Sequence, residues 1–211
     1  MADKKELIII GASGHGKVVA DIARKNGYEK ISFLDDNEAL QKCGGYDVIG
    51  RSEDASAYGC DFAVAVGNAK IRRKIMDMLR REGKNTPTLI HPNAVLAEDV
   101  SVGAGTVIMA GAVVNPGAKI GQGCIVNTGA SVDHDCTLGD FVHVSVGAHI
   151  AGTVEIGDET WVGIGAAVSN NLCVAGGCMI GAGAVVVKNI DEAGVYIGVP
   201  ARKKTAGEQD K

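Results

Sequence analysis

An aliphatic residue stands at every sixth position of this 211-residue chain from Ile90 to Val186, without a slip or an insertion. Self-similarity at a fixed period indicates a repeat fold, and here it restricts the architecture more than any other feature. A period of six matches neither the turn of a helix nor simple strand alternation. It suits a parallel β-helix, in which every short strand is followed by a corner. The repeated residues are Ile90, Leu96, Val102, Ile108, Val114, Ile120, Val126, Val132, Leu138, Val144, Ile150, Ile156, Val162, Val168, Val174, Ile180 and Val186.

Two residues before these aliphatics the chain often has a small residue, and one residue after them it often has glycine. We expect the aliphatic side chains to fill a narrow interior and the small residues to fit beside them near the corners. The glycines should supply backbone angles that a Cβ would penalise. Three hexads per coil would bring aliphatics eighteen residues apart into stacked columns, as in other solenoids. The small residues are Thr106, Ala112, Ala118, Cys124, Ala130, Cys136, Ala148, Thr160, Ala166, Cys178 and Ala184, and the glycines are Gly103, Gly121, Gly139, Gly157, Gly163 and Gly181.

The composition argues against several classes of function. A net charge of −4 and an aromatic content of 4% leave no basic stripe and few stacking surfaces, so nucleic-acid binding is not expected. The first residues lack the apolar core of a signal peptide, and no apolar run approaches the ~20 residues that cross a bilayer. None of the six cysteines forms a C-x-x-C pair, which favours packing over metal or redox roles. We therefore expect a cytoplasmic protein without membrane insertion.

Before the repeat, the sequence alternates between strand and helix patterns. This alternation predicts a small parallel α/β unit with right-handed crossovers. We expect a Rossmann-like unit over 1–87, an all-β parallel β-helix over 88–190 and a C-terminal tail over 191–211. The predicted elements of the first unit are strands at Leu7–Ile10, Lys30–Leu34 and Asp61–Val66 and helices at about Lys17–Asn26 and Ala69–Glu82.

A glycine-rich turn connects the first predicted strand to the first helix. Its pattern, Gly11-x-x-Gly14-x-Gly16, allows close backbone approach to an anion, and a helix N-terminus offers free amides to a phosphate. Asp35 and Asp36, at the end of the next strand, can accept hydrogen bonds from ribose hydroxyls. Together they favour a nucleotide-bearing ligand, although a tight turn with a solvated acidic loop is the alternative. At this length the unit is half of a dinucleotide-binding domain, which disfavours NAD.

His134 is the histidine of the repeat with the most unusual setting. It follows Val132 by two residues and so lies on the outer surface, where a solvated histidine is the default. The segment Asn127–Asp135 replaces the usual glycine with asparagine and then aspartate. This setting singles out His134 among the histidines of the repeat. An imidazole with a pKa of about 6.5 can accept a proton near neutral pH.

The motifs Gly-Ala-Ser-Gly-His-Gly16, Phe33-Leu-Asp-Asp36, Val66-Gly-Asn68 and His91-Pro92, ahead of a hexapeptide repeat, together resemble the sugar acyltransferases of the sialic acid O-acetyltransferase family. Within it, the chain is most similar to the acetyl-CoA-dependent N-acetyltransferases that act on UDP-4-amino-4,6-dideoxy sugars. The resemblance extends from about Leu7 to Arg202. It implies a left-handed β-helix, a homotrimer with active sites between subunits, acetyl-CoA as co-substrate without a metal, and a role in bacterial-type glycan precursor synthesis.

The same resemblance implies roles for individual residues. His134 would be the general base, and Asp135 would raise its basicity, although relatives often carry glutamate there. Neighbouring residues on a strand point apart, so contact between this pair requires a corner. The nucleotide sugar would contact Ser13, Gly14, His15, Asp35, Asp36 and Gly67. Acetyl-CoA would contact His143, Ile164 and Ala182, the last of which replaces a family glycine.

Two further groups are candidates for contacts with acetyl-CoA. The thioester oxygen needs a donor as it becomes an oxyanion, and we expect the amide of Gly152, one coil from His134, to supply it. Lys188, Arg202 and Lys203 could meet CoA phosphates, with a solvated basic tail as the alternative. Residues from Thr205 onward are expected to be disordered.

Three other functions remain open. O-acetylation of sialic acid or of another sugar hydroxyl would use the same base. An interface zinc enzyme of the γ-carbonic-anhydrase type would use His143 and His149, which lie in consecutive hexads and therefore on different faces, so its ligands would come from two subunits. A nucleotide-sugar-binding protein without catalysis is the third possibility.

Overall fold

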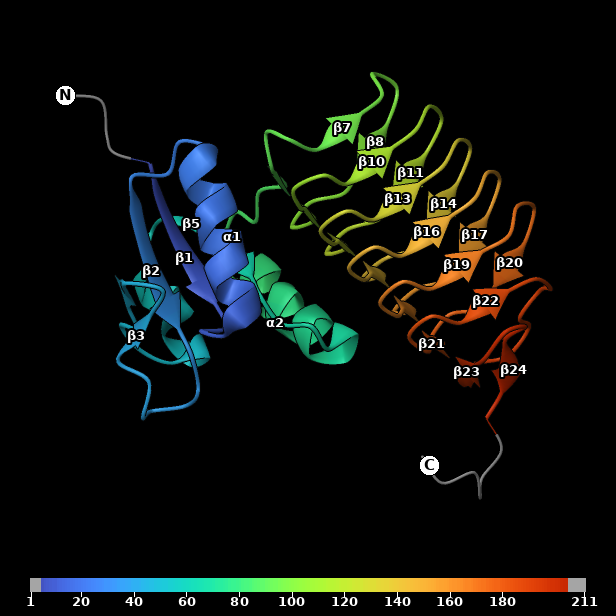
Figure 1. Ribbon diagram of the computed structural model, residues 1–211. Coiled ribbons are helices and arrows are strands. Elements are labelled where there is room, and N and C mark those ends of the chain that lie inside the picture. Colours follow the sequence, from blue (N-terminus) through green and yellow to red (C-terminus); the bar gives the residue numbers. More distant parts are fainter. Residues whose placement is uncertain (1–4, 205–211) are drawn as a thin grey trace.

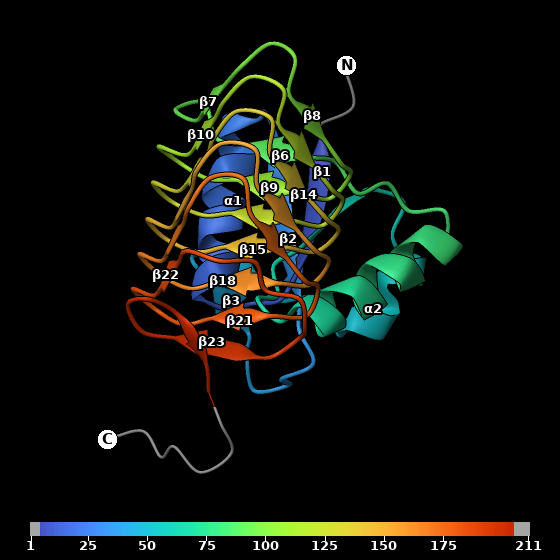
Figure 2. The ribbon, with the colours of Figure 1, turned by 90° about the vertical axis from the view of Figure 1, so that its right-hand side faces the viewer.

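The computed structural model describes residues 5–204 (Figure 1). The prediction for the residues from Thr205 onward lies outside this range. The chain forms an N-terminal α/β unit and a long prism of short strands, and the α/β unit packs against one side of the prism (Figures 1 and 2). Neither helix of the described residues is long and apolar enough to cross a membrane.

The α/β unit is a three-stranded parallel sheet with a helix on each face. The strand order is β2 (Lys30–Leu34), β1 (Glu6–Ile10), β5 (Asp61–Val64). The helices are α1 (Gly14–Lys25) and α2 (Ala69–Arg81). The two helices bury both faces of the central strand β1. Its alternate side chains point to opposite faces of the sheet, so each helix contacts every second residue. Leu7 and Ile9 belong to the core that includes α1, whereas Ile8 and Ile10 pack with α2.

These elements agree with the expected strands and helices, apart from their ends. Helix α1 begins at Gly14 rather than Lys17, because the glycine turn itself forms its first turn. The sequence patterns did not predict the short hairpin of β3 (Lys42–Cys43) and β4 (Tyr46–Asp47) or the 3-10 helix η1 (Ser52–Ala57). These are short connections that lack hydrophobic periodicity, and periodicity is the main indication of secondary structure in a sequence.

From β6 to β22 the prism is a parallel β-helix of two-residue strands, so the architecture expected from the repeat is confirmed; the last two strands, β23 and β24, pair antiparallel. Its strands form three sheets, and strand residues pair with those eighteen positions further on, as in Val114↔Val132 and Val132↔Ile150. The strands are β6 (Leu89–Ile90), β7 (Val95–Leu96), β8 (Ser101–Val102), β9 (Val107–Ile108), β10 (Val113–Val114), β11 (Lys119–Ile120), β12 (Ile125–Val126), β13 (Ser131–Val132), β14 (Thr137–Leu138), β15 (His143–Val144), β16 (His149–Ile150), β17 (Glu155–Ile156), β18 (Trp161–Val162), β19 (Ala167–Val168), β20 (Cys173–Val174), β21 (Met179–Ile180), β22 (Val185–Val186), β23 (Val195–Ile197) and β24 (Arg202–Lys203).

Each sheet forms one face of the prism and is named here by its first strand. The β6 face contains β6, β9, β12, β15, β18, β21, β23 and β24; the β7 face contains β7, β10, β13, β16, β19 and β22; the β8 face contains β8, β11, β14, β17 and β20. The chain visits the faces in this order, so the prism has a β6–β7 edge, a β7–β8 edge and a β8–β6 edge. The β7–β8 edge lies across the prism from the β6 face.

The interior of the prism is aliphatic. From Ile108 to Val186 every sixth residue is at most 4% exposed, and the small residues two positions earlier are at most 2% exposed. Ile90, Leu96 and Val102, in the first coils, are only half-buried. The predicted core is therefore correct, and its open end coincides with the start of the repeat.

The glycines that follow the aliphatics have a different purpose from the one expected. Their backbone angles are not left-handed; instead, adjacent coils approach too closely for a side chain. A Cβ on Gly139 would lie 2.3 Å from Asp158 Oδ1, and one on Gly103 would lie 2.4 Å from the Gln122 amide nitrogen. The left-handed residue comes two positions later, where Asp135 (φ 57°) and Phe141 (φ 60°) adopt it without being glycine.

The α/β unit sits against the β6 face and the β8–β6 edge of the prism. Leu89, Val107 and Ile125 of the β6 face join the core that includes α1, and Phe141 of the β8–β6 edge joins the core that includes α2. These contacts bring the glycine turn at the start of α1 to the β6 face near β15.

Candidate active site

His134 and Asp135 form a hydrogen-bonded pair at the β7–β8 edge. His134 Nδ1 lies 2.8 Å from Asp135 Oδ2. The contact exists because Asp135 has a left-handed backbone, with φ of 57°, which turns its carboxylate back toward its neighbour. A bond from the Asp135 amide to the carbonyl of Pro116 (3.0 Å), in the preceding coil, holds this corner. The corner that contact requires is therefore present.

The backbone on the other side of His134 is fixed by a second carboxylate. Asp133 Oδ1 accepts a hydrogen bond from the His134 amide (2.8 Å) and another from Asn115 Nδ2 (2.7 Å). The bond from Asn115, followed by that from the His134 amide, lowers the pKa of Asp133. Asp133 is thus ionised and orients the main chain of His134.

The protonation of the His134 ring follows from its partner. An ionised carboxylate can only accept a hydrogen bond, so Nδ1 carries the proton and Nε2 presents its lone pair. The hydrogen bond that His134 donates to Asp135 raises the pKa of His134, and the charges of Asp133 and Asp135 act in the same direction. The His134 side chain is 56% exposed in the single chain, so Nε2 is accessible to a second molecule.

Gly152 lies directly beneath this imidazole, one coil further along the same edge. A Cβ on Gly152 would lie 2.4 Å from His134 Nε2, so only glycine leaves room for the ring. Within residues 5–204, the Gly152 amide donates to no acceptor. A free amide therefore lies close to the basic nitrogen.

His143 lies at the opposite side of the prism, in β15 of the β6 face. It is 8% exposed and stacks on Trp161, with ring centroids 4.9 Å apart. Asn127 Oδ1 accepts from the Thr128 amide, so the Asn127 amino group faces His143 Nε2 at 3.2 Å. His143 Nε2 is then the acceptor and Nδ1 carries the proton. This buried Nδ1 has no partner among the described residues.

The environment keeps the His143 ring neutral. Burial, with added repulsion from Arg72 and His15, lowers the pKa of His143 to about 3. His15, in the first turn of α1, behaves similarly: burial and Arg72 lower its pKa to about 4, and its Nε2 is buried without a partner in the described part of the chain. Two neutral histidines, each with an unsatisfied polar atom, therefore meet where the α/β unit joins the prism.

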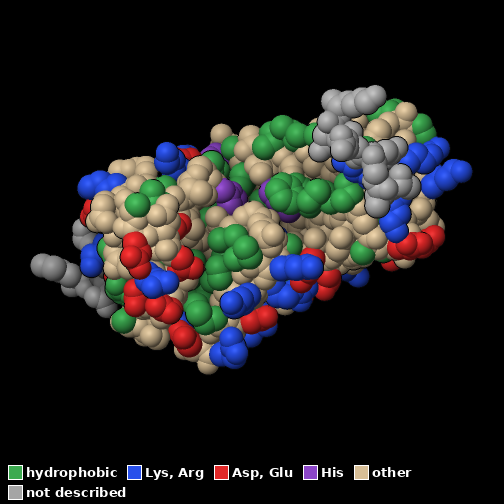
Figure 3. Space-filling view, turned by 90° about the horizontal axis from the view of Figure 1, so that it is seen from below, with side chains coloured by type: hydrophobic (Ala, Val, Ile, Leu, Met, Phe, Trp, Pro, Cys, Tyr) green, Lys and Arg blue, Asp and Glu red, His purple; other side chains and the backbone are tan. Residues whose placement is uncertain are grey.

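Ile164 and Ala182 lie next to this cluster, on the β6–β7 edge. Together with Ser145, Trp161 and Met179 they line a pocket of about 270 Å³. Figure 3 shows histidine side chains at the junction of the two parts, beside a hydrophobic surface on the prism. His143, Ile164 and Ala182, which the resemblance assigned to acetyl-CoA, are thus neighbours of one another.

No sequence pattern indicates a role for Trp161, Ser145 or Asn127. Trp161 is the chain's single tryptophan, at an outward strand position, and it donates a hydrogen bond to Ser145 Oγ at 2.5 Å. A single tryptophan at an outward position of an aliphatic repeat is the sequence signal that could have indicated a binding role for Trp161. Asn127 begins the segment that departs from the glycine pattern, which was noted without a function.

The predicted nucleotide-sugar residues gather at the carboxyl ends of β1, β2 and β5. Ser13 precedes α1 without a side-chain cap, and Gly14 and His15 form the first turn of the helix. Asp35 uses both carboxylate oxygens on main-chain amides, accepting from Ala12 (2.7 Å) and Asn37 (2.9 Å). It therefore holds the glycine turn in place.

Asp36 and Gly67 are also engaged with the protein. Asp36 Oδ1 accepts from the Ser52 amide at 3.0 Å, and the carbonyl of Gly67 accepts from Arg72 at 2.8 Å. Among the described residues, the second oxygen of Asp36 accepts no hydrogen bond and so is available to a ligand.

The predicted site residues fall into two groups on different sides of one chain. His134, Asp135 and Gly152 lie on the β7–β8 edge. The other group, consisting of the α/β residues with His143, Ile164 and Ala182, lies at the β6 face and the β6–β7 edge. The β7–β8 edge is across the prism from the β6 face, so a single chain does not unite them.

A metal site receives no support from the described residues. No group of three or more His, Cys, Asp or Glu side chains among them could hold an ion. His143 and His149 belong to the β6 and β7 faces, as expected from their spacing. His149 instead has its Nδ1 2.8 Å from Ser131 Oγ.

Residues 6–79 match the PglD N-terminal domain family. The acetyltransferase domain of PglB from Neisseria gonorrhoeae is 42% identical, with a TM-score of 0.92, over 95% of this chain and 100% of that chain. That domain has also been solved in complex with acetyl coenzyme A. A histidine-to-asparagine mutant of perosamine N-acetyltransferase from Caulobacter crescentus, in complex with CoA and GDP-perosamine, is 33% identical, with a TM-score of 0.92, over 95% of this chain and 97% of that chain.

Among curated proteins, the chain is 32% identical over 112 residues to UDP-N-acetylbacillosamine N-acetyltransferase of Bacillus subtilis, which covers 50% of this chain and 52% of that protein. The aligned part thus spans about half the length of the curated relatives. The solved structures match over nearly the whole chain. They confirm the expected fold class, a small Rossmann-like α/β domain followed by a left-handed β-helix.

Proposed function

Because this chain belongs to the hexapeptide-repeat sugar acetyltransferases that carry a PglD-type N-terminal domain, we propose that it transfers the acetyl group of acetyl-CoA to the 4-amino group of a UDP-linked amino-dideoxy sugar. The proposed setting is cytoplasmic synthesis of glycan precursors. The observation that carries the proposal is the His134–Asp135 pair, an oriented imidazole on the wall of an otherwise aliphatic prism.

His134 is the proposed general base. The amine nitrogen attacks the thioester carbonyl carbon, and its proton passes to His134 Nε2. The C–S bond breaks, and the departing sulfur takes up a proton as CoA leaves as the thiol. The Nδ1–H bond to Asp135 keeps the lone pair on Nε2 and favours the protonated ring. A positioned base of this kind contributes about 10²–10⁴-fold to rate.

The Gly152 amide is the proposed oxyanion donor. As the carbonyl carbon becomes tetrahedral, its oxygen gains negative charge, which a pre-oriented N–H group stabilises. The Gly152 amide has no acceptor in the described part of the chain, and Gly152 packs against the ring that carries the base. Proximity of a free donor to Nε2 supports this role.

His143 is the centre of the proposed acetyl-CoA site. Its buried Nδ1–H lacks an acceptor within residues 5–204, and an unsatisfied buried donor is costly unless a ligand completes it. The carbonyl oxygens of acetyl-CoA are acceptors of the required kind. Ile164, Ala182 and Trp161 provide an apolar surface for the pantetheine arm. These features fit the co-substrate.

The α/β unit is the proposed nucleotide-sugar site. The N-terminus of α1, with Ser13, Gly14 and His15, offers free amides to a diphosphate. The free oxygen of Asp36 can accept from a ribose hydroxyl. Asp35 maintains the turn that presents those amides, and Gly67 lies at the neighbouring strand end.

A neighbouring copy is required to complete this reaction. The base group and the acetyl-CoA group lie on different sides of one prism, so a complete site needs the β7–β8 edge of one chain beside the β6–β7 edge of another. A rotationally symmetric trimer would repeat this contact three times, since head-to-tail interfaces close into rings. The homotrimer with sites between subunits is therefore part of the proposal.

Acetyl-CoA consumption with a panel of nucleotide sugars tests the proposal. The panel contains UDP-, GDP-, dTDP- and CMP-linked 4-amino sugars and the corresponding 4-hydroxy sugars, and the released CoA thiol is measured. We expect thiol release with a UDP-linked amino sugar and an N-acetyl product. Turnover of hydroxy sugars or sialic acid alone would establish O-acetylation. Nucleotide-sugar binding without thiol release would indicate a non-catalytic binding protein.

A further inference from the structure

Arg72 is a fully buried cation at the boundary between the two parts of the molecule. It lies in the first turn of α2 and is 1% exposed. No carboxylate within residues 5–204 forms a salt bridge with it. A buried charge without such a partner is costly unless hydrogen bonds satisfy it. The guanidinium must therefore be held by other groups.

Four main-chain carbonyls hold the Arg72 guanidinium. Nη1 donates to the carbonyls of Val66 and Gly67, each at 2.8 Å. Nε donates to Gly123 and Nη2 to Phe141, each at 2.7 Å. Carbonyl oxygens accept through charge-assisted bonds, which are stronger than neutral ones. One side chain thus satisfies acceptors from three separate segments.

These segments belong to both parts of the protein. Val66 and Gly67 follow β5 at the edge where the proposed nucleotide-sugar site lies. Gly123 and Phe141 are the left-handed corner residues of two successive coils on the β8–β6 edge. The coils of the prism hold these two carbonyls in place. Arg72 therefore connects the end of β5 to the rigid backbone of the β-helix.

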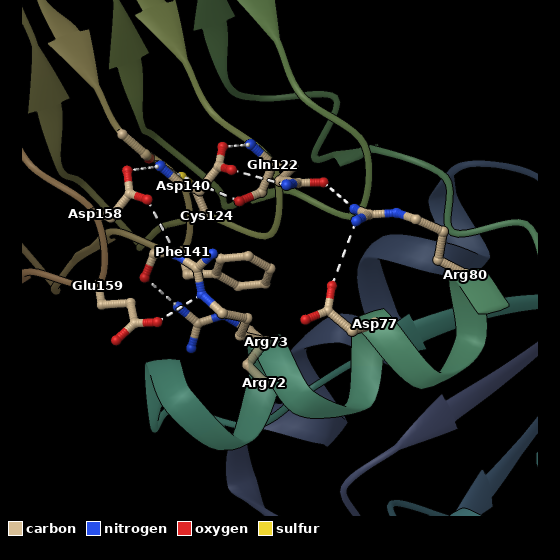
Figure 4. Close-up of polar contacts among 11 residues, drawn as sticks. Arg72, Arg73, Asp77, Arg80, Gln122, Cys124, Asp140, Phe141, Asp158 and Glu159 are labelled. Carbon is tan, nitrogen blue, oxygen red and sulfur yellow. Dashed lines mark hydrogen bonds and ion pairs between the residues drawn. The ribbon is translucent and has the colours of Figure 1, made fainter.

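The remaining hydrogen bonds and ion pairs between α2 and the prism are different in kind (Figure 4). Arg73 pairs with Asp158 (3.1 Å) and with Glu159, and Arg80 bonds Gln122. These are side-chain contacts at the surface, and none reaches the end of β5. Arg73 and Glu159 are half-buried and Asp158 is exposed, and ion pairs that stay open to solvent in this way contribute little to stability.

Arg72 also acts on the histidines of the junction. Its charge helps to lower the pKa of both His15 and His143, after burial. The groups that act on Arg72 in turn are Cys124 and Glu159, and burial lowers its own pKa to about 10. Arg72 therefore remains charged and faces the cluster that the α/β unit and the prism share.

We propose that Arg72 is a positioning residue, which holds the Val66–Gly67 end of the nucleotide-sugar site at a fixed place relative to the β-helix. This inference rests on the proposed function of the α/β unit. The planar fork of arginine supplies donors in three directions, whereas a lysine ammonium is a point charge that cannot span the same carbonyls. A substitution should displace the strand end and leave the interior of the prism intact.

Hydrogen–deuterium exchange tests the structural part of the proposal without using activity. Full-length Arg72→Lys and Arg72→Met are compared with Arg73→Met, a matched control from the same helix that keeps all four carbonyl bonds. We expect faster exchange at residues 66–68 in both Arg72 variants and wild-type exchange there in Arg73→Met. Protection in the prism strands should be unchanged. Equal exchange at 66–68 in all four proteins would overturn the proposal.

Steady-state kinetics test its consequence for the reaction. In Arg72→Lys we expect KM for the nucleotide sugar to rise about 10- to 100-fold, which corresponds to the loss of one charge-assisted bond. KM for acetyl-CoA should stay within about threefold of wild type, and Arg73→Met should leave both constants unchanged. Equal losses for both substrates would indicate general unfolding and would contradict the proposal. If wild type acetylates no nucleotide sugar, the proposed function fails, and the exchange comparison still decides whether Arg72 fixes the strand end.

Discussion

His134 Nδ1 lies 2.8 Å from Asp135 Oδ2, although the two residues are adjacent in the sequence. Adjacent side chains on a strand would point apart. The left-handed φ of 57° at Asp135 removes this restriction, because the chain turns a corner between the two side chains. The pair therefore depends on the coil geometry as much as on the identities of the residues.

Replacing His134 with alanine removes the proposed base. We expect His134→Ala to lower kcat by about 10²–10⁴-fold and to leave acetyl-CoA affinity unchanged, because the ring lies apart from the His143 group. Thiol release and calorimetric titration with acetyl-CoA measure the two effects. A variant with wild-type kcat would assign the base to another residue.

Asp135→Asn should shift the pH dependence of the reaction. The hydrogen bond that His134 donates to Asp135 raises the pKa of His134, so the loss of this bond lowers that pKa. A base works when deprotonated, and the acidic limb of the kcat/KM profile should therefore move to lower pH, with a reduced maximum. Asparagine tolerates the left-handed corner, so the fold should be kept. Asp135→Glu is the matched control, and it should retain the wild-type limb; an unmoved limb in Asp135→Asn would contradict the role of this carboxylate.

Gly152→Ala should displace the imidazole. The new Cβ would lie 2.4 Å from His134 Nε2, so the ring must rotate away from its position. We expect a loss of kcat that approaches that of His134→Ala, together with a nearly unchanged melting temperature. Gly59→Ala is the control, since a Cβ there meets no atom within 4 Å. Full activity of Gly152→Ala would argue against catalysis at this edge.

Stability should decrease as the pH falls below about 6.5. The pKa of His15 is lowered to about 4 and that of His143 to about 3, whereas both titrate near 6.5 in the unfolded chain. Between these values the unfolded state binds protons that the folded state does not. The free energy of unfolding should thus fall by about 1.4 kcal/mol per pH unit for each histidine, until the pH reaches about 4 for His15 and about 3 for His143. Urea unfolding at several pH values measures the slope, which should be smaller in His15→Gln; an identical slope would show that His15 is not buried neutral.

Asp35→Ala should destabilise the α/β unit. Both of its carboxylate oxygens accept main-chain hydrogen bonds, including that of Ala12 in the glycine turn. Their loss should cost about 1–3 kcal/mol and weaken nucleotide-sugar binding. Asp36→Ala, which loses one exposed bond to Ser52, should weaken sugar binding with a smaller effect on stability. Denaturant unfolding measures the loss of stability, and calorimetry measures nucleotide-sugar binding. A larger destabilisation by Asp36→Ala than by Asp35→Ala would contradict the structural role assigned to Asp35.

The prism was predictable because its sequence signal is long and redundant. Each repeated aliphatic from Ile108 to Val186 lies in the same buried environment, so the sequence repeat predicts the core residue by residue. The reason for the glycines that often follow the aliphatics was predicted wrongly. They allow neighbouring coils to approach closely, as Gly139 does with Asp158, and this distance is set by how the coils stack. The division of the chain at about residue 87 stays a prediction.

The candidate site was less accessible to prediction. Motifs indicated His134 and His143, but not the stacking of Trp161 on His143 or the bond from Asn127, which join residues far apart in the sequence. In the sequence, Arg72 is indistinguishable from the other basic residues of an amphipathic helix. Its burial follows only from the packing of α2 against the β8–β6 edge.

The sequence by itself determined the β-helix, its interior and the α/β unit that precedes it, because hydrophobic periodicity and glycine spacing are local properties of the chain. The tertiary structure alone decided that His134 and Asp135 meet, that Arg72 joins the two parts, and that the base lies across the prism from His143. Those relationships depend on backbone corners and on contacts between distant segments, whose energies no local pattern records.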